Sequence, residues 1–338
     1  MGVGKALVVG ASGFLGSHVT RKLVAAGRDV RILVRPSSNT RMTDDLPVER
    51  FTGDLLDPDS LGAAFDGVTT VFHCAVETRA WLRDPAPLYR LNIDGLVHSM
   101  QAALAAGVGC FVMTSTIATI GRNRTGIATE LDVLQKVEKA PHYIRARHAA
   151  EQKFFEFCRD RGLPGIACCV ANTYGPGDIA PTPHGKILML AAAGRMPTYL
   201  DSVVASVGIE DAAEALLLAE ARGHVGERYI ISERGLHQRE MYRIAAEAGG
   251  AVPGRCVRMP LWVAYVLGWI AQSWAWARGR ESQLCVQSVT LSHCIDDMDA
   301  TKARRDLSWR PRPVEEAIRA AITFYQSVAA EAVPTGRS

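Results

Sequence analysis

The stretch ALVVGASGFLG, residues 6–16, decides the fold of this chain. Its four apolar residues predict a buried strand, and glycines at positions 10, 13 and 16 follow with the spacing GxxGxxG. Small residues let the backbone turn tightly into a helix and approach a pyrophosphate, whose charge the helix N-terminus stabilises. The motif therefore predicts a dinucleotide site. The residues expected to contact the dinucleotide are Gly10, Ser12, Gly13, Phe14, Leu15 and Gly16.

Outward from this motif, short β-branched runs alternate with helical stretches. Further strands are expected at residues 30–34, 48–51, 69–74, 110–114 and 165–170. Helices between successive strands imply crossover connections and hence a parallel sheet with helices on both faces. The predicted fold class is α/β, a Rossmann-type doubly wound parallel sheet followed by a smaller C-terminal α/β substrate lobe.

The domain boundary is expected near Tyr174, where GPGD (175–178) and PTP (181–183) form a loop-rich stretch. Residues 1–173 are predicted to form the nucleotide-binding domain, which also carries the catalytic residues. Residues 174–328 are predicted to form mainly the substrate lobe, with some return to the first domain, and residues 329–338 a flexible tail. We interpret the strand at residues 228–231 as part of the smaller lobe.

The end of the second strand indicates which dinucleotide is bound. An NAD site usually places an acidic residue there, whereas this chain has Arg35, followed by Ser38. A guanidinium suits a 2′-phosphate, so NADP(H) is the preferred cofactor and NAD(H) the alternative. After the third strand, the Asp54 carboxylate is expected to accept a hydrogen bond from the adenine amino group, with Leu55 beside it.

Composition excludes several other classes of function. A net charge of +3 over 338 residues gives no basis for nucleic-acid binding. The eight cysteines have no CxxC pairs and no Cys/His ligand spacing, so no metal site is expected and the thiols are interpreted as reduced. Because the first apolar run leads straight into the glycine motif and does not resemble a signal peptide, the expected location is cytoplasmic.

Residues 261–277 read LWVAYVLGWIAQSWAWA, with four tryptophans, and Arg278 and Arg280 follow. The segment falls short of the roughly 20 apolar residues that cross a bilayer. The favoured interpretation is a core helix or a lid over the substrate pocket. Tryptophan beside arginine is also the chemistry of a membrane interface, so peripheral membrane contact through residues 261–280 is the alternative.

The motifs together resemble the extended short-chain dehydrogenase/reductases, also called the NAD-dependent epimerase/dehydratase family. The similarity extends to about Tyr325, and its closest branch includes dihydroflavonol reductases, 3β-hydroxysteroid dehydrogenases and hopanoid-associated epimerase-like proteins. Besides GxxGxxG, the motifs that carry the resemblance are GDLLD (53–57), FHCA (72–75), LNIDG (91–95), TSTIATIG (114–121), Tyr143 with its helix, YGPGD (174–178) and KARRDLSWRP (302–311).

The resemblance implies a catalytic group of a hydroxyl residue, a tyrosine and a cation. Tyr143 is the tyrosine that exchanges a proton with the substrate oxygen, and Thr116, with Ser115 beside it, is the hydroxyl that orients the carbonyl. The cation that stabilises the phenolate falls on Arg147. Tyr143 and Arg147, with Ala75 and Val170, are also expected to contact the cofactor.

This chain departs from the family pattern at three places. The family has lysine where Arg147 stands; arginine keeps the charge but does not easily lose a proton, so a proton relay through that nitrogen is in doubt. Cys169 and Val170 replace an Arg-Pro pair near the nicotinamide, and Gly208 stands where relatives often carry histidine.

The leading hypothesis for function is NADP(H)-dependent interconversion of a carbonyl and an alcohol on a hydrophobic small molecule, such as a steroid, flavonoid, polyketide or lipid. Two alternatives stay open: an NAD-dependent sugar-nucleotide epimerase or dehydratase, and a non-catalytic NADP-binding protein. By the same resemblance, a homodimer is expected through the helices at residues 87–106 and 145–161.

Overall fold

A seven-stranded parallel sheet forms the centre of the computed structural model, which describes residues 4–123, 126–252, 255–295 and 297–331. The strand order is β11-β7-β5-β4-β1-β2-β3, so the order reverses beside β1, where β2 lies on one side and β4 on the other. Such a switch point leaves a crevice at the carboxyl ends of the strands, where dinucleotides bind. The strands are β1 (Lys5–Val9), β2 (Val30–Val34), β3 (Glu49–Thr52), β4 (Val68–His73), β5 (Cys110–Thr116), β7 (Gly165–Val170) and β11 (Arg228–Ile231). The predicted α/β doubly wound fold is confirmed.

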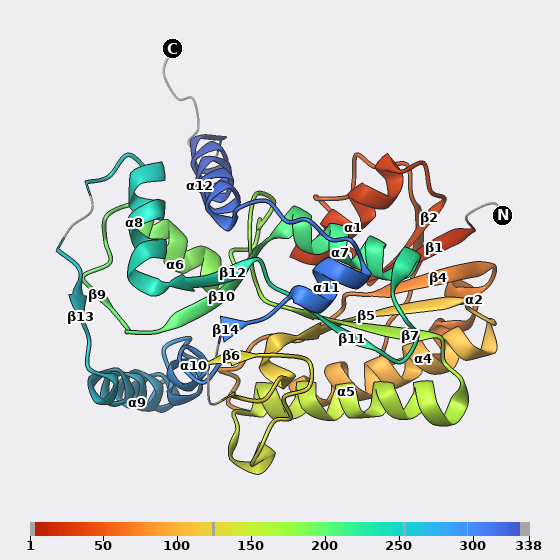
Figure 1. Ribbon diagram of the computed structural model, residues 1–338, viewed down its shortest axis with the longest axis horizontal. Coiled ribbons are helices and arrows are strands. Elements are labelled where there is room, and N and C mark those ends of the chain that lie inside the picture. The colour runs from red at the N-terminus through yellow and green to blue at the C-terminus, as the bar shows by residue number, and fades with distance from the viewer. Residues whose placement is uncertain (1–3, 124–125, 253–254, 296, 332–338) are drawn as a thin grey trace.

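Helices cover both faces of this sheet because its strands are apolar on both sides. Figure 1 shows α1 and α7 on one face and α4 and α5 on the other. The bounds of these helices are α1 (Phe14–Ala25), α4 (Leu96–Ala105), α5 (His142–Arg161) and α7 (Ile209–Arg222), and the short helices α2 (Gly62–Phe65) and α11 (Thr301–Asp306) lie at the margins. Each face has its own cluster of buried apolar side chains, which fixes the helices on the sheet.

The strand at residues 228–231 corrects one prediction. It pairs with β7 in the large sheet as β11, and therefore does not belong to the smaller lobe. The preceding helix α7 packs against α1 on the same sheet. The short apolar run that follows Arg228 gives no sign of which sheet it joins, because any buried strand offers the same side chains.

The second lobe surrounds a three-stranded sheet with its own apolar core. Its main elements are β8 (Asn172–Tyr174), β10 (Val203–Gly208), β12 (Arg234–His237), α6 (Pro183–Ala192), α8 (Gln238–Ala248) and α12 (Val314–Glu331). The strand pairs β9 (Thr198–Tyr199) with β13 (Val257–Arg258) and β6 (Ile127–Ala128) with β14 (Asp297–Met298) flank it. Because α12 extends to Glu331, the predicted tail begins inside a helix; residues 332–338 lie outside the described residues.

Two helices differ from their predicted bounds near the sheet's carboxyl edge. The helix expected from about residue 145 begins at His142, so Tyr143 lies in its first turn. The helix expected over residues 87–106 is instead α3 (Ala86–Tyr89), a π-helical stretch at residues 90–95 and then α4. Single-turn π-helical insertions are frequent at functional sites because they shift side chains relative to a regular helix.

The tryptophan-rich segment forms the helix α9 (Leu261–Ala277), and its interpretation as a core helix is wrong. Only Ala264, Gly268 and Ala275 of this helix are buried. Figure 1 shows α9 at the outer edge of the molecule, with α10 (Val286–Leu291) on its inner side. In the described part of the chain no helix is both long and apolar enough to cross a bilayer.

Candidate cofactor and active site

The glycine loop after β1 has the geometry of a pyrophosphate cradle. Gly10 has a φ of +86°, and a side chain there would lie 2.6 Å from the backbone nitrogen of Ala75, at the end of β4. A side chain on Gly16 would overlap the Gly10 carbonyl, so this glycine lets α1 start directly against the strand. Gly13 is exposed, and a Cβ there would meet only the Gly10 oxygen, at 3.3 Å. The turn is therefore open on its outer side, where a diphosphate approaches.

The other residues of the loop fit this role in different ways. Ser12 is half-buried between the glycines, at the mouth of the turn. Phe14 and Leu15 begin α1 and are both half-buried; the Phe14 ring lies edge-on to the ring of His18, and Leu15 packs against the sheet core. Their side chains fix the helix start, so their contribution to a ligand is through the backbone N–H groups that the first turn leaves unpaired.

The adenosine end of the cofactor is expected over β2 and β3, whose ends lie side by side. The Gly53 N–H donates to the Val34 carbonyl at 3.0 Å, which places Asp54 next to Arg35. Arg35 is exposed, and among the described residues its guanidinium has no hydrogen-bond or ion-pair partner. Ser38 turns back to accept a hydrogen bond from the Arg35 N–H at 3.0 Å. An arginine held at this edge with unused donors fits a 2′-phosphate.

Asp54 and Leu55 occupy the adjacent corner. One carboxylate oxygen of Asp54 accepts from the Leu56 N–H at 2.9 Å, which closes a local turn and leaves the other oxygen for a ligand. Leu55 is buried and packs in the core beneath, so any contact to the cofactor is made by its backbone. Asp54 can therefore close this local turn and still accept a hydrogen bond from an adenine amino group.

Tyr143 and Arg147 lie one turn apart on α5, at the carboxyl end of β5. Tyr143 is half-buried, and among the described residues its hydroxyl has no hydrogen-bond partner. Arg147 is 2% exposed, and its Nη2 donates to the Thr114 carbonyl at 2.5 Å. Its Nε is buried and has no hydrogen-bond partner among the residues that the structure describes. Burial lowers the pKa of Arg147, and the neighbouring Tyr143 and Glu151 oppose that shift. The guanidinium nevertheless keeps its proton, so Tyr143 faces a fixed buried cation.

The two candidate hydroxyls of β5 point in different directions, because successive side chains alternate across a strand. Thr116 is half-buried at the strand end, pairs in register with Val170 of β7, and its Oγ1 accepts from the Ala118 N–H at 3.2 Å. Ser115 is buried and donates to the carboxylate of Glu151. Thr116 and Val170 therefore lie together at the sheet edge, whereas the Ser115 hydroxyl is committed to the interior.

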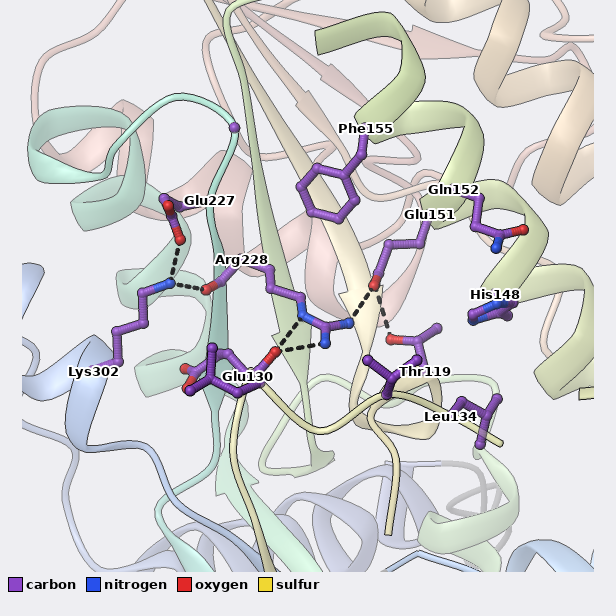
Figure 2. A pocket seen from close by; sticks show the side chains of 13 residues that line it. Thr119, Glu130, Leu134, His148, Glu151, Gln152, Phe155, Glu227, Arg228 and Lys302 are labelled. Atoms are coloured by element: carbon purple, nitrogen blue, oxygen red, sulfur yellow. Dashed lines mark hydrogen bonds and ion pairs between the residues drawn. The ribbon is translucent and has the colours of Figure 1, made fainter. Parts of the chain in front are cut away.

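Glu151 is a buried carboxylate that the sequence interpretation missed. It accepts from the Ser115 and Thr119 hydroxyls, the latter at 2.9 Å, and from Arg228 Nη1 at 2.8 Å. Glu151, Thr119 and Arg228, labelled in Figure 2, line a cavity of about 400 Å³ between α5 and the start of β11. The available signal was periodicity: Arg147 and Glu151 are in phase with Phe154, on the stripe of α5 that faces the sheet.

The loop after β4 is fixed by Asn92, from the π-helical stretch. Asn92 is buried; its side-chain oxygen accepts from the Glu77 N–H and its amide donates to the Glu77 carbonyl, both at 3.0 Å. This pair of bonds holds the segment that follows Ala75, the residue in contact with Gly10. The LNIDG motif thus shapes the wall of the nucleotide crevice.

Buried groups beneath the site are held in their neutral forms. Burial, helped by the charge of Arg147, lowers the pKa of His73 to about 3, and a ring nitrogen lies 3.1 Å from the Ser99 hydroxyl. Burial raises the pKa of Cys74 to about 12, so it offers no thiolate nucleophile. Neither His73 nor Cys74 therefore offers a charged acid–base group beneath the site.

The second lobe reaches the site through α10. The Gln287 side-chain oxygen accepts from the backbone N–H of His142, next to Tyr143, at 3.1 Å. Tyr89 lies on the other side, with its hydroxyl 3.1 Å from the His142 ring. The start of α5 is therefore enclosed between the helix at residues 86–89 and the α9–α10 unit, a pairing that motif analysis did not anticipate.

Two departures from the family pattern have structural counterparts. Cys169 is buried on β7, and its Sγ lies 3.7 Å from the Glu151 carboxylate. Gly208 ends β10, where a Cβ would come within 2.7 Å of Asp211 and 3.2 Å of Ala317. A larger residue at position 208 would require Asp211 to move, so this glycine is matched to its surroundings.

A nucleotide crevice at the switch point and a Tyr-x-x-x-cation pair at the end of β5 define an NAD(P)-dependent enzyme of the short-chain dehydrogenase/reductase class. Residues 6–232 match the model of the NAD dependent epimerase/dehydratase family, and the chain belongs to this family. Relatives named as reductases support an NAD(P)-dependent enzyme of the extended type.

Three similar proteins illustrate the relationship. A putative dihydroflavonol 4-reductase of Synechocystis sp. is 29% identical over 326 residues, covering 95% of this chain and 94% of that protein. Sterol demethylase protein B of Methylococcus capsulatus is 33% identical over 226 residues, covering 67% and 69%. The crystal structure of gox2253 superposes with a TM-score of 0.83 at 31% identity, covering 96% and 98% of the two chains.

Proposed function

We propose that this protein is an NADP(H)-dependent oxidoreductase that interconverts a carbonyl and an alcohol on a hydrophobic small molecule. The observation that carries the proposal is the pair formed by Tyr143 and Arg147. A tyrosine hydroxyl with no hydrogen-bond partner among the described residues lies one helical turn from a buried cation, at the sheet edge where the crevice opens. This arrangement supports proton exchange at the Tyr143 oxygen.

In the direction of reduction, Tyr143 donates its hydroxyl proton to the carbonyl oxygen of the substrate. A nicotinamide held in the crevice would supply the hydride for the carbonyl carbon, and would accept it in the reverse direction. Thr116 orients the carbonyl oxygen through its hydroxyl, and Arg147 stabilises the phenolate left on Tyr143. Since arginine does not release its proton, the phenolate regains its proton from solvent rather than through residue 147.

The residues of the crevice fit an NADP(H) molecule. The turn formed by Gly10, Gly13 and Gly16 would hold the pyrophosphate, and Arg35 with Ser38 would hold the 2′-phosphate. The unpartnered Nε of buried Arg147 would find an acceptor in a ribose hydroxyl. The exposed Arg35 with unused donors is the feature that favours NADP(H) over NAD(H).

A hydrophobic substrate is supported by composition and by the names of relatives. Between residues 186 and 200, which include most of α6, the only charged residues are Lys186 and Arg195, too few to bind a sugar diphosphate well. Two similar proteins are named for a flavonoid and a sterol. Epimerase or dehydratase chemistry on a sugar nucleotide is the competing outcome of the experiment that follows.

The test is consumption of NADPH with a panel of hydrophobic ketones, comparing the wild type with Tyr143→Phe. We expect turnover with at least one ketone, and Tyr143→Phe to lose turnover by about 100-fold or more while its NADPH affinity stays within a few-fold. A Tyr143→Phe protein with full activity would remove Tyr143 from the mechanism. Tightly held NAD that is not consumed would favour the epimerase or dehydratase.

We also propose that the protein is a homodimer formed through residues 87–106 and 145–161. These helical segments lie together on one face of the large sheet, which gives them a common outer surface. Sedimentation velocity should report twice the chain mass of 36.6 kDa. A species of single-chain mass across the concentrations used would contradict the proposal.

A further inference from the structure

The helix α9 presents large apolar side chains to the outside. Trp262, Trp269 and Trp274 are 69%, 62% and 61% exposed. Other large apolar side chains exposed along the helix and just beyond it are Leu261, Val266, Leu267, Ile270, Trp276 and Leu284. Single exposed apolar residues are common, but many large ones gathered on one helix mark a binding surface.

The opposite side of α9 explains why these side chains face outward. A Cβ at Gly268 would lie 3.3 Å from the Cys285 carbonyl and from Val289, so the helix needs a glycine to pack closely on α10. The Tyr265 hydroxyl is hydrogen-bonded to the Thr290 hydroxyl at 3.0 Å and to the His293 Nε2 at 2.9 Å. The inward side therefore consists of small and polar residues, and the helix is fixed with its tryptophans outward.

The charge around this surface is mainly positive, although Glu281 follows Arg280 and Asp201 pairs with Arg258 at 2.8 Å. Residues 248–280 contain four arginines and no aspartate or glutamate. The Arg278 guanidinium lies 3.6 Å from the ring centroid of Trp274, and Arg83 lies 6.0 Å from that of Trp276. Arg278 and Arg280 have no acidic partner among the residues that the structure describes. Arginine stacked on exposed tryptophan is the chemistry of a bilayer's headgroup level.

We infer that α9 is a membrane-docking helix that lies flat on an anionic lipid surface. Its 17 residues span only about 25 Å and would place the tryptophans among the acyl chains near the headgroups. The arginines at its C-terminal end would meet anionic headgroups, which supply the negative charge that this region lacks. Such binding is peripheral, because α9 is too short to cross the bilayer.

A second copy of the chain is less suited than a lipid surface to bind the exposed face of α9. A partner's α9 region would bring another set of arginines and a single nearby carboxylate, that of Glu281, so the two patches would offer each other little charge complement. An anionic lipid surface complements both the apolar side chains and the charge. The observations therefore favour lipid.

Docking would also place the candidate active site at the membrane. The link is α10, which packs on α9 and whose Gln287 accepts from the backbone of His142, beside Tyr143. A substrate dissolved in the bilayer would then reach the site without crossing water. This consequence rests on the proposed function, whereas the docking of α9 does not.

The experiment is co-sedimentation of the full chain with vesicles of phosphatidylcholine alone or mixed with phosphatidylglycerol. The key variant is Trp269→Glu, and its matched control is Val225→Glu, which introduces the same charge at an exposed valine outside α9. We expect the wild type to bind mixed vesicles more tightly than neutral ones. Trp269→Glu should lower the partition coefficient by about tenfold or more, and Val225→Glu should leave it unchanged.

The charge component is tested with Arg278→Gln/Arg280→Gln, which should remove most of the preference for phosphatidylglycerol. NADPH titration of every variant checks folding and separates a failure of docking from a failure of the proposed function. Wild-type protein that stays in the supernatant with both vesicle types would overturn the inference. Equal binding by Trp269→Glu, or a self-association that Trp269→Glu abolishes without any vesicle binding, would overturn it as well.

Discussion

Replacing Arg147 with methionine removes the buried cation next to Tyr143 while keeping a side chain of similar length. Side chains four residues apart on a helix have Cβ atoms about 5–6 Å apart. At about 6 Å and an effective dielectric constant of about 20, a unit charge stabilises the Tyr143 phenolate by roughly 3 kcal/mol. Losing that energy in the transition state corresponds to a fall in kcat of about 100-fold.

The assay is steady-state alcohol oxidation and ketone reduction across a range of pH, with Arg147→Lys as the charge-preserving control. We expect Arg147→Lys to retain at least about a tenth of wild-type kcat. Without the cation, Arg147→Met should lose kcat in both directions of the reaction, because the transition state lacks the charge that stabilises the developing phenolate. The lost bond to the Thr114 carbonyl should lower the unfolding free energy by about 1–3 kcal/mol, so activity is measured well below Tm. Wild-type kcat in Arg147→Met would refute the electrostatic role.

Three further substitutions test separate parts of the site. Arg35→Asp should weaken NADPH binding by about 10- to 100-fold and NADH binding only slightly; equal losses for the two cofactors would exclude a 2′-phosphate role. Thr116→Ala should lower kcat by about 100-fold. Ser115→Ala should leave kcat within a few-fold but lower Tm, because the Ser115 hydroxyl donates to the buried carboxylate of Glu151. Similar losses of kcat in the two variants would contradict this difference in role. Burial lowers the pKa of His73 from 6.5 to about 3. Between these two pH values the folded protein binds fewer protons at His73 than the unfolded chain does. The unfolding free energy should therefore fall by up to about 1.4 kcal/mol per pH unit as the solution is acidified. His73→Gln should flatten that slope in urea unfolding at several pH values, and an unchanged slope would show that another group is responsible.

The nucleotide half of the fold was predictable because its signals are local. The glycines at positions 10, 13 and 16 act within one turn, and most strands of the large sheet contain a short run of apolar or β-branched residues that local pattern detects. The placement of β11 was not predictable, since the three apolar residues after Arg228 carry no information about their partner strand. The obstacle was the distance in sequence between β11 and its partner strand β7, and not a low β-propensity of residues 228–231.

The site shows the same division. The family resemblance was enough to pair Tyr143 with Arg147, whereas neither Glu151 nor the inward turn of Ser115 follows from a motif. Both depend on how α5 rests on the end of β5, which is a tertiary fact. The helix α9 was misjudged for a related reason: an apolar segment indicates burial against something, and only the structure shows that its tryptophans lie outside the protein core.

The central claim is that the protein uses a diffusible NADP(H) cofactor for oxidoreduction. Its most direct test is fluorescence titration of the purified protein with NADPH and NADH, after any co-purified nucleotide has been identified. We predict empty protein that binds NADPH reversibly and in preference to NADH, through the cradle at Gly10 and the guanidinium of Arg35. Tightly held NAD, with no preference for NADPH, would contradict the claim and indicate a sugar-modifying epimerase or dehydratase instead.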